Sequence, residues 1–122
     1  MPPSQDCLFC TLVAEGSHVR KIKGFVAIDD INPKAEVHLL VIPERHVDTF
    51  REVSDFPEEE AKRMLDFIAE TAAAVGLRDY RVVTNVGPTA GQTIFHMHWH
   101  VLGGKLDVDE IAETLAAEVA TL

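Results

Sequence analysis

Three histidines alternate with apolar residues near the end of the chain, and this run restricts the fold more than any other feature. Residues 96–100 read His-Met-His-Trp-His, and two glycines follow at 103–104. Side chains of a β-strand point alternately to its two faces, so we predict a strand over 93–102 with His96, His98 and His100 on one face. The opposite face, which includes Phe95, is apolar and is predicted to point into the core.

The preceding residues carry further strand and helix signals. Segments rich in Val, Ile and Leu predict strands over 25–29, 37–42 and 80–86. A long helix is predicted over 57–75, because Pro57 suits its first turn and Gly76 the position after its end. We expect its residues at helical spacing to face the core: Met64, Ile68, Ala72 and Val75. A short C-terminal helix over 106–122 is predicted to begin near Asp107. The predicted class is α+β, with a mainly antiparallel sheet of about five strands and one principal helix.

Length and charge exclude several functions. A chain of 122 residues fits one domain, predicted as 1–122 with a core of 7–105. The net charge of −9 argues against nucleic-acid binding, although a local pocket can still hold one small phosphorylated ligand. No apolar stretch reaches the roughly 18 residues needed to span a membrane, and the first residues do not resemble a secretory signal. We therefore expect a cytoplasmic protein without a membrane partner.

Two kinds of chemistry fit the alternating histidines. A His-x-His pair on a strand can supply two zinc ligands, with further ligands from elsewhere in the chain. A neutral imidazole can instead attack phosphorus if its other ring nitrogen donates to a backbone carbonyl. His38, within an apolar strand segment, either orients this region or is a core histidine.

Cys7 and Cys10 also leave several interpretations open. They are separated by two residues, and the pair can be structural, redox-active or metal-binding. A thioredoxin-like role is disfavoured because no βαβ unit surrounds the pair. Two thiolates at this spacing make half of a tetrahedral zinc site.

Residues 96–102 resemble the signature of the histidine triad (HIT) superfamily, His-φ-His-φ-His-φ-φ with φ apolar, at every position. Segments 30–33, 38–46, 85–87, 91–93 and 103–104 look like the HINT branch in particular, so the resemblance covers about residues 7–105. It implies a HIT-like fold and a homodimer that pairs through the main helix and a strand. The segment between Cys10 and Asp30 looks shorter than in HINT proteins, so we expect a trimmed hairpin around 21–24. The Trp-Pro-Pro-Gly tail of animal HINT proteins is absent.

The resemblance implies hydrolysis or transfer at the α-phosphate of purine nucleotides, of the adenosine 5′-phosphoramidate type. His98 matches the family nucleophile, which forms a nucleotidyl-histidine intermediate, and His100 matches the residue that contacts the phosphate. Asp30 matches the carboxylate that pairs with the ribose hydroxyls. The residues that match the phosphate loop are Asn85, Gly91, Gln92 and Thr93. Those that match or adjoin the base pocket are Leu8, Phe9, Leu12, Ile28 and Ile31.

Similarity to zinc-containing HIT proteins implies a structural zinc ion held by Cys7, Cys10, His46 and His96. On this interpretation His96 holds metal while His98 attacks phosphorus. Three other functions remain open: a dinucleoside polyphosphate hydrolase, a non-catalytic nucleotide-binding or scaffold protein, and a metallohydrolase whose triad itself holds catalytic zinc.

Overall fold

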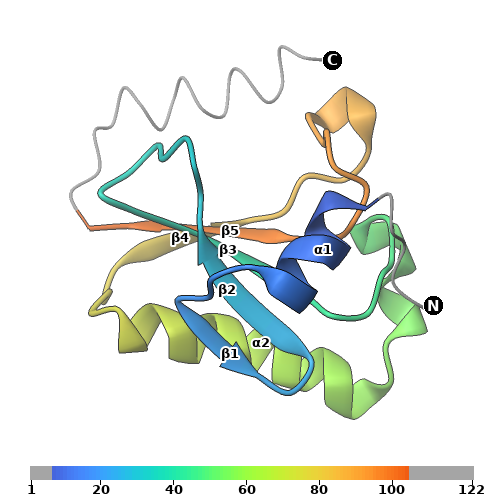
Figure 1. The fold of residues 1–122 in the computed structure, drawn as a ribbon, viewed down its shortest axis with the longest axis horizontal. Helices are drawn as coiled ribbons and strands as arrows, with labels where there is room; N and C mark the ends of the chain where they lie inside the picture. The colour runs from blue at the N-terminus through green and yellow to red at the C-terminus, as the bar shows by residue number, and fades with distance from the viewer. Residues whose placement is uncertain (1–6, 105–122) are drawn as a thin grey trace.

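The computed structural model describes residues 7–104, which form a five-stranded sheet with a helix on each side (Figure 1). The elements in chain order are α1 (Leu8–Glu15), β1 (Arg20–Ile22), β2 (Phe25–Asp29), β3 (Val37–Pro43), the 3-10 helix η1 (Phe50–Asp55), α2 (Glu58–Ala74), β4 (Tyr80–Val83), the 3-10 helix η2 (Pro88–Ala90) and β5 (Trp99–Gly103). The strands are arranged in the order β1-β2-β3-β5-β4, and every neighbouring pair is antiparallel. The predicted α+β class and antiparallel sheet are confirmed.

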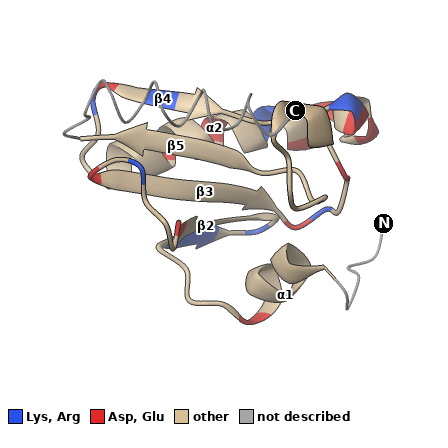
Figure 2. Ribbon diagram, turned by 90° about the horizontal axis from the view of Figure 1, so that it is seen from above, with Lys and Arg blue, Asp and Glu red and all other residues tan. Residues whose placement is uncertain are grey.

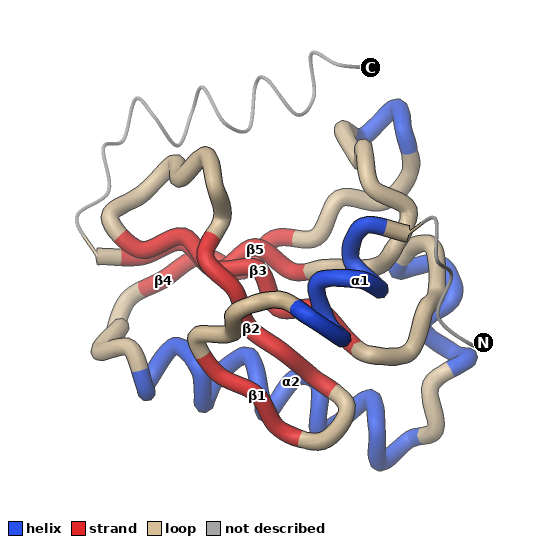
Figure 3. The backbone as a smooth tube through the Cα atoms, in the orientation of Figure 1, coloured by secondary structure: helices blue, strands red, loops and turns tan. Residues whose placement is uncertain are grey.

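The two faces of the sheet pack against different helices, as Figure 3 shows. Alternate residues of β2 separate between them: Phe25 and Ala27 pack in the cluster that contains α2, whereas Val26 and Ile28 pack in the cluster that contains α1. The central strands β3 and β5 carry no Lys, Arg, Asp or Glu (Figure 2). His38 of β3 and His100 of β5 are therefore carried by the buried central strands of the sheet.

α2 begins and ends within one residue of the bounds predicted for it, with Pro57 as its N-cap instead of in its first turn. Met64, Ile68 and Ala72 are buried in the core, while Val75 is half-buried at its edge. Gly76 has a φ of +81°, and the N–H groups of residues 76 and 77 donate to the carbonyls of residues 73 and 72. This pattern is a Schellman motif, which requires the left-handed backbone that glycine adopts without strain.

Three predictions about elements were wrong. The segment predicted as a strand over 93–102 is irregular up to His98, and only Trp99–Gly103 pairs as β5. Phe95, predicted to face the core, is 44% exposed, and the strand predicted over 80–86 ends at Val83. The sequence analysis also missed α1. The hairpin expected around 21–24 is present, and in it three residues of β1 pair with β2.

Two further expectations concern the ends of the chain and the membrane. The C-terminal helix predicted over 106–122 lies outside the described residues. Within residues 7–104, no helix is long and apolar enough to cross a membrane.

Candidate active site and metal centre

His98 lies just before β5, with a ring whose two nitrogens face different surroundings. Its Nδ1 is 2.8 Å from the carbonyl oxygen of His96, and because a carbonyl only accepts, Nδ1 carries the hydrogen. The lone pair of the neutral ring is therefore on Nε2. The Thr84 hydroxyl donates to the His98 carbonyl at 2.8 Å, and the ring of Phe9 contacts the His98 ring edge-on at 4.8 Å between centroids. These contacts hold the imidazole in one orientation and one tautomer.

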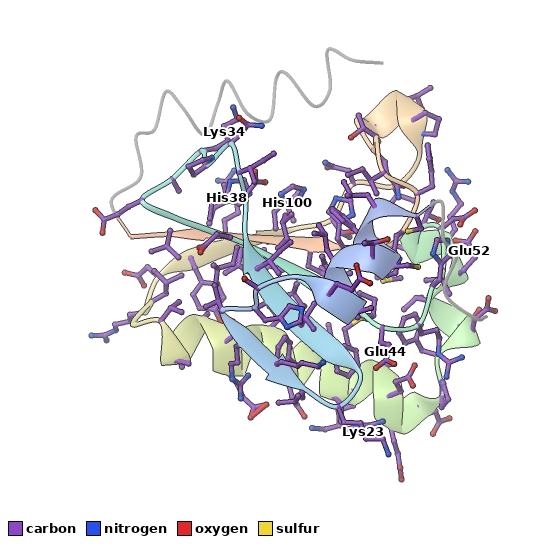
Figure 4. All side chains as sticks on the ribbon, viewed as in Figure 1. Lys23, Lys34, His38, Glu44, Glu52 and His100 are labelled. Atoms are coloured by element: carbon purple, nitrogen blue, oxygen red, sulfur yellow. The ribbon has the colours of Figure 1, made fainter. Side chains whose placement is uncertain are left out.

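His100 receives its orientation from His38 on the neighbouring strand. The two residues come from β5 and β3, and Figure 4 shows their side chains next to one another below Lys34. The backbone N–H of Lys34 donates to His38 Nδ1 at 3.1 Å, and His38 Nε2 is 3.0 Å from His100 Nδ1. Since His38 Nδ1 accepts, its Nε2 carries the hydrogen and donates to His100. His100 then holds its own hydrogen on Nε2.

The His100 ring is uncharged at neutral pH. The pKa of His100 is lowered to about 4, mainly by burial and also by repulsion from His98 and His38, while Asp30 acts in the opposite direction. Because His98 and His100 lie 5.3 Å apart between ring centroids, two charged rings here would repel each other. The site thus places an Nε2 lone pair on His98 next to an Nε2–H donor on His100.

The four residues that the sequence assigned to zinc converge around one point. Cys7 Sγ lies 3.3 Å from His96 Nδ1, and Cys10 Sγ lies 3.2 Å from His46 Nδ1 and 3.5 Å from His96 Nδ1. All four ligand atoms lie within 4.8 Å of one another. Zn–S and Zn–N bonds of the usual length in a tetrahedron separate sulfur from nitrogen by about 3.6 Å. The donor set therefore fits a tetrahedral zinc ion with little movement.

The two histidines of this cluster are oriented by groups outside it. His96 Nε2 donates to the Pro43 carbonyl at 2.7 Å, and His46 Nε2 is 3.1 Å from the Asp48 carboxylate. Both rings therefore direct an Nδ1 lone pair toward the thiols, which is the arrangement of an oriented metal ligand. Burial lowers the pKa of His96 to about 4, so this lone pair is available at neutral pH.

The loop before the histidines is held by Gln92. Its side chain is 3% exposed, accepts from the Gly87 N–H at 2.9 Å and donates to the carbonyls of Asp48 and Ile94 at 2.7 and 2.9 Å. Gln92 is thus committed to the shape of the loop. The other residues assigned to the loop are half-buried or exposed: Asn85, Gly91 and Thr93.

The residues assigned to the base pocket separate into two groups. Phe9, Leu12 and Ile28 belong to the apolar cluster between α1 and the sheet, in which the Phe9 ring contacts the His98 ring. Leu8 and Ile31 do not join it, since they are 55% and 91% exposed.

Asp30, assigned to the ribose, lies beside His38. Its Oδ2 is 3.4 Å from His38 Nε2, and its Oδ1 accepts from the N–H of Asn32 at 2.8 Å. The structure therefore brings Asp30, His38 and His100 together at one end of the histidine cluster.

The sequence analysis did not identify the groups that orient the histidines. The backbone groups among them are the Lys34 N–H and the carbonyls of Pro43 and His96, and the side chains are those of Thr84 and Asp48. A backbone group has no sequence signal, because every residue offers one. His38 alone had a signal, as a histidine within an apolar strand.

An antiparallel sheet that carries these clustered histidines defines a histidine triad protein. The HIT domain model matches residues 12–107, so this chain belongs to the HIT family. An uncharacterized HIT-like protein of Helicobacter pylori is 40% identical over 90 residues, which are 72% of this chain and 84% of that protein. A HIT family hydrolase from Legionella pneumophila is 37% identical, with a TM-score of 0.76 over 82% of this chain and 94% of its own. A Zn-bound histidine triad family protein from Mycobacterium smegmatis is 28% identical, with a TM-score of 0.66 over 94% of each chain.

Proposed function

We propose that this protein is a HINT-like nucleotidyl hydrolase or transferase that acts at the α-phosphate of purine nucleotides, with His98 as the nucleophile. The tautomer of His98 carries the proposal. Its Nδ1–H donates to the His96 carbonyl, so the nucleophilic lone pair of the neutral ring lies on Nε2. The relatives named as HIT family hydrolases support hydrolysis as the reaction class.

The reaction proceeds in two displacements. His98 Nε2 attacks the α-phosphorus of an adenosine 5′-phosphoramidate, the P–N bond to the amine breaks, and the amine leaves with its electron pair and takes up a proton. Water then attacks the phosphorus of the nucleotidyl-His98 intermediate, the P–Nε2 bond breaks, and AMP is released. The His96 carbonyl accepts from the positively charged ring of the intermediate and stabilises it.

The surrounding residues bind the nucleotide. The Nε2–H of His100 donates to a non-bridging phosphate oxygen, and Asn85, Gly91 and Thr93 supply the loop around it. Gln92 acts through the loop whose shape it holds. Asp30 accepts from the ribose hydroxyls, and its proximity to His38 and His100 supports a nucleotide that reaches from the ribose to the triad. Phe9, Leu12 and Ile28 form the inner wall of the base pocket, with Leu8 and Ile31 at its rim.

The test compares His98→Ala with the wild-type protein on an adenosine phosphoramidate. We expect wild type to release AMP and to yield a histidine carrying AMP on acid-free quenching, detected by mass spectrometry. His98→Ala should lose at least about a hundredfold in kcat, as removal of a central catalytic group does. His18→Gln is the matched control, since His18 bonds only to the Leu12 carbonyl in the contacts described and lies outside the triad. Full activity of His98→Ala would refute the assignment.

We also propose that Cys7, Cys10, His46 and His96 hold a structural zinc ion. The ion would tie α1 to the segment that precedes β5 and so fix the His96 carbonyl against His98. The geometry of the four donors and the Zn-bound relative support this assignment. Elemental analysis should find about one zinc per chain, and Cys10→Ser should retain less than about a tenth of it. Asp30→Asn is the control, because it alters the other donor cluster and should keep its zinc.

A homodimer through β4 and α2 completes the proposal. β4 is an edge strand, and Val82 on it is 41% exposed although it lies opposite the core residue Val101. Leu65 on α2 is also exposed. An apolar edge strand of this kind favours pairing with a second copy that continues the sheet. Solution scattering should give twice the chain mass for wild type and a single mass for Val82→Glu, and a monomeric wild type would exclude the dimer.

A further inference from the structure

The cluster of Asp30, His38 and His100 raises a question that the proposed reaction does not answer. Their ligand atoms lie within 4.8 Å of one another, so two histidines and one carboxylate face a common point, as in many sites for divalent transition metals. The same residues are the ones we assign to a nucleotide. A metal ion held here would block that role.

We propose that the backbone N–H of Lys34 is a positioning group that fixes the tautomer of His38 and, through it, that of His100. The same N–H prevents these residues from binding a metal ion. The assignment of tautomers stands on hydrogen bonds alone, whereas its consequence for catalysis rests on the proposed function.

The first step is the direction of one hydrogen bond. A backbone N–H can only donate, so the 3.1 Å contact from Lys34 N to His38 Nδ1 places the lone pair of His38 on Nδ1. The loop is shaped to present this N–H, because Asp30 Oδ1 accepts from the Asn32 N–H and Pro33, the residue between Asn32 and Lys34, has a φ fixed by its ring. His38 is 5% exposed, so water does not compete freely for its ring.

The second step passes the orientation to His100. With its lone pair on Nδ1, His38 carries its hydrogen on Nε2, which lies 3.0 Å from His100 Nδ1 and 3.4 Å from Asp30. The shorter contact requires His100 to accept at Nδ1. His100 then presents Nε2–H, the donor that a phosphate oxygen requires.

The third step excludes the metal. A metal ion between the three residues would need the Nε2 lone pair of His38, which exists in the neutral ring only when Nδ1 carries the hydrogen. That hydrogen would point at the Lys34 N–H, and two donors would oppose each other in a buried site. The His100 Nδ1 lone pair is also occupied by His38. The Lys34 amide thus keeps the site free for the nucleotide.

The tautomers can be read directly in the wild-type protein. Long-range proton–nitrogen NMR spectra of the histidine rings near pH 7 should show both His38 and His100 protonated on Nε2 and bare on Nδ1. A His38 protonated on Nδ1 would overturn the proposal, whatever the activity of the protein. Correct tautomers in a protein that hydrolyses no phosphoramidate would instead refute only the proposed function.

Two substitutions at one position then test the N–H. Lys34→Pro removes it, while Lys34→Ala removes the side chain and keeps it. We expect Lys34→Ala to retain the wild-type His38 tautomer. In Lys34→Pro the ratio of the two His38 tautomers should shift by about fivefold, the effect of one hydrogen bond, and kcat should fall by no more than that factor, with KM changed less than about twofold.

Metal binding gives a second measurement that misfolding would not produce. In protein whose cysteine site already holds zinc, Ni²⁺ should bind Lys34→Pro at least about fivefold more tightly than Lys34→Ala, the factor that corresponds to the one hydrogen bond of the Lys34 N–H. Adding Asp30→Asn to Lys34→Pro should reverse the gain. Equal Ni²⁺ affinity of the two Lys34 variants would overturn the exclusion of metal, and so would tight Ni²⁺ binding to His38 in wild type.

Discussion

Because of His100, the free energy of unfolding should fall as the pH is lowered from 7 to 5. In the folded chain burial holds its pKa near 4, whereas an unfolded histidine titrates near 6.5. The folded pKa is the lower one, so the unfolded chain binds more protons between these values and acid favours unfolding. The contribution is fully present above about pH 6.5 and is lost as the pH falls toward 4.

The size of the effect follows from the two pKa values. A group with a pKa of about 6.5 unfolded and about 4 folded lowers the free energy of unfolding by about 2 kcal/mol between pH 7 and pH 5. That is a large part of the 5–15 kcal/mol typical of a small domain. The loss should be visible in an ordinary unfolding titration.

Urea unfolding at pH 7 and pH 5 measures it, with His100→Gln as the comparison. Glutamine retains an acceptor for the His38 Nε2–H but does not titrate, so this variant should lose about 2 kcal/mol less than wild type over the same interval. His18→Gln should lose as much as wild type, because His18 lies outside the cluster. If wild type and His100→Gln lose equal stability, burial does not hold His100 neutral and the argument fails.

Three other changes test the packing, the end of α2 and the loop, each by urea unfolding at pH 7. Phe67→Ala should cost about 3–5 kcal/mol, because its fully buried ring stacks on Phe25, and a loss under about 1 kcal/mol would contradict this. Gly76→Ala should cost about 1–2 kcal/mol, since its φ of +81° strains any other residue, and an unchanged midpoint would contradict the Schellman end. Gln92→Met should cost about 2–4 kcal/mol by leaving the Gly87 N–H and two carbonyls unpaired, and a neutral result would mean that the loop does not depend on Gln92.

Local signals predicted the elements whose packing follows their periodicity. α2 was predicted from apolar residues at helical spacing, of which Met64, Ile68 and Ala72 reach the core, and the strands at 25–29 and 37–42 were predicted from their content of Val, Ile and Leu. α1 was missed for the opposite reason. It has only eight residues, and its N-cap Cys7 and first-turn residues Phe9 and Cys10 have positions that depend on contacts with His96 and His98.

The residue types of the site were predictable, but their protonation was not. Spacing and resemblance pointed to His98, His100 and the four proposed zinc ligands, and the structure brings each set together. Which ring nitrogen holds the hydrogen depends on the Pro43 and His96 carbonyls and on the Lys34 amide. These backbone groups become partners only through the tertiary fold.

We predicted a strand over 93–102, but the backbone is irregular before Trp99. This irregular backbone explains how one histidine motif can serve the two sites that we propose. In a regular strand the three rings would share one face, and the backbone carbonyls between them would be used by neighbouring strands. Because pairing begins only at Trp99, the His96 carbonyl is available to His98 Nδ1, and the His98 carbonyl accepts from the Thr84 hydroxyl. His96 can then turn its ring toward Cys7 and Cys10 while His100, inside the strand, faces His38. The late start of strand pairing therefore gives each histidine a different hydrogen-bond partner, as the different roles that we propose for them require.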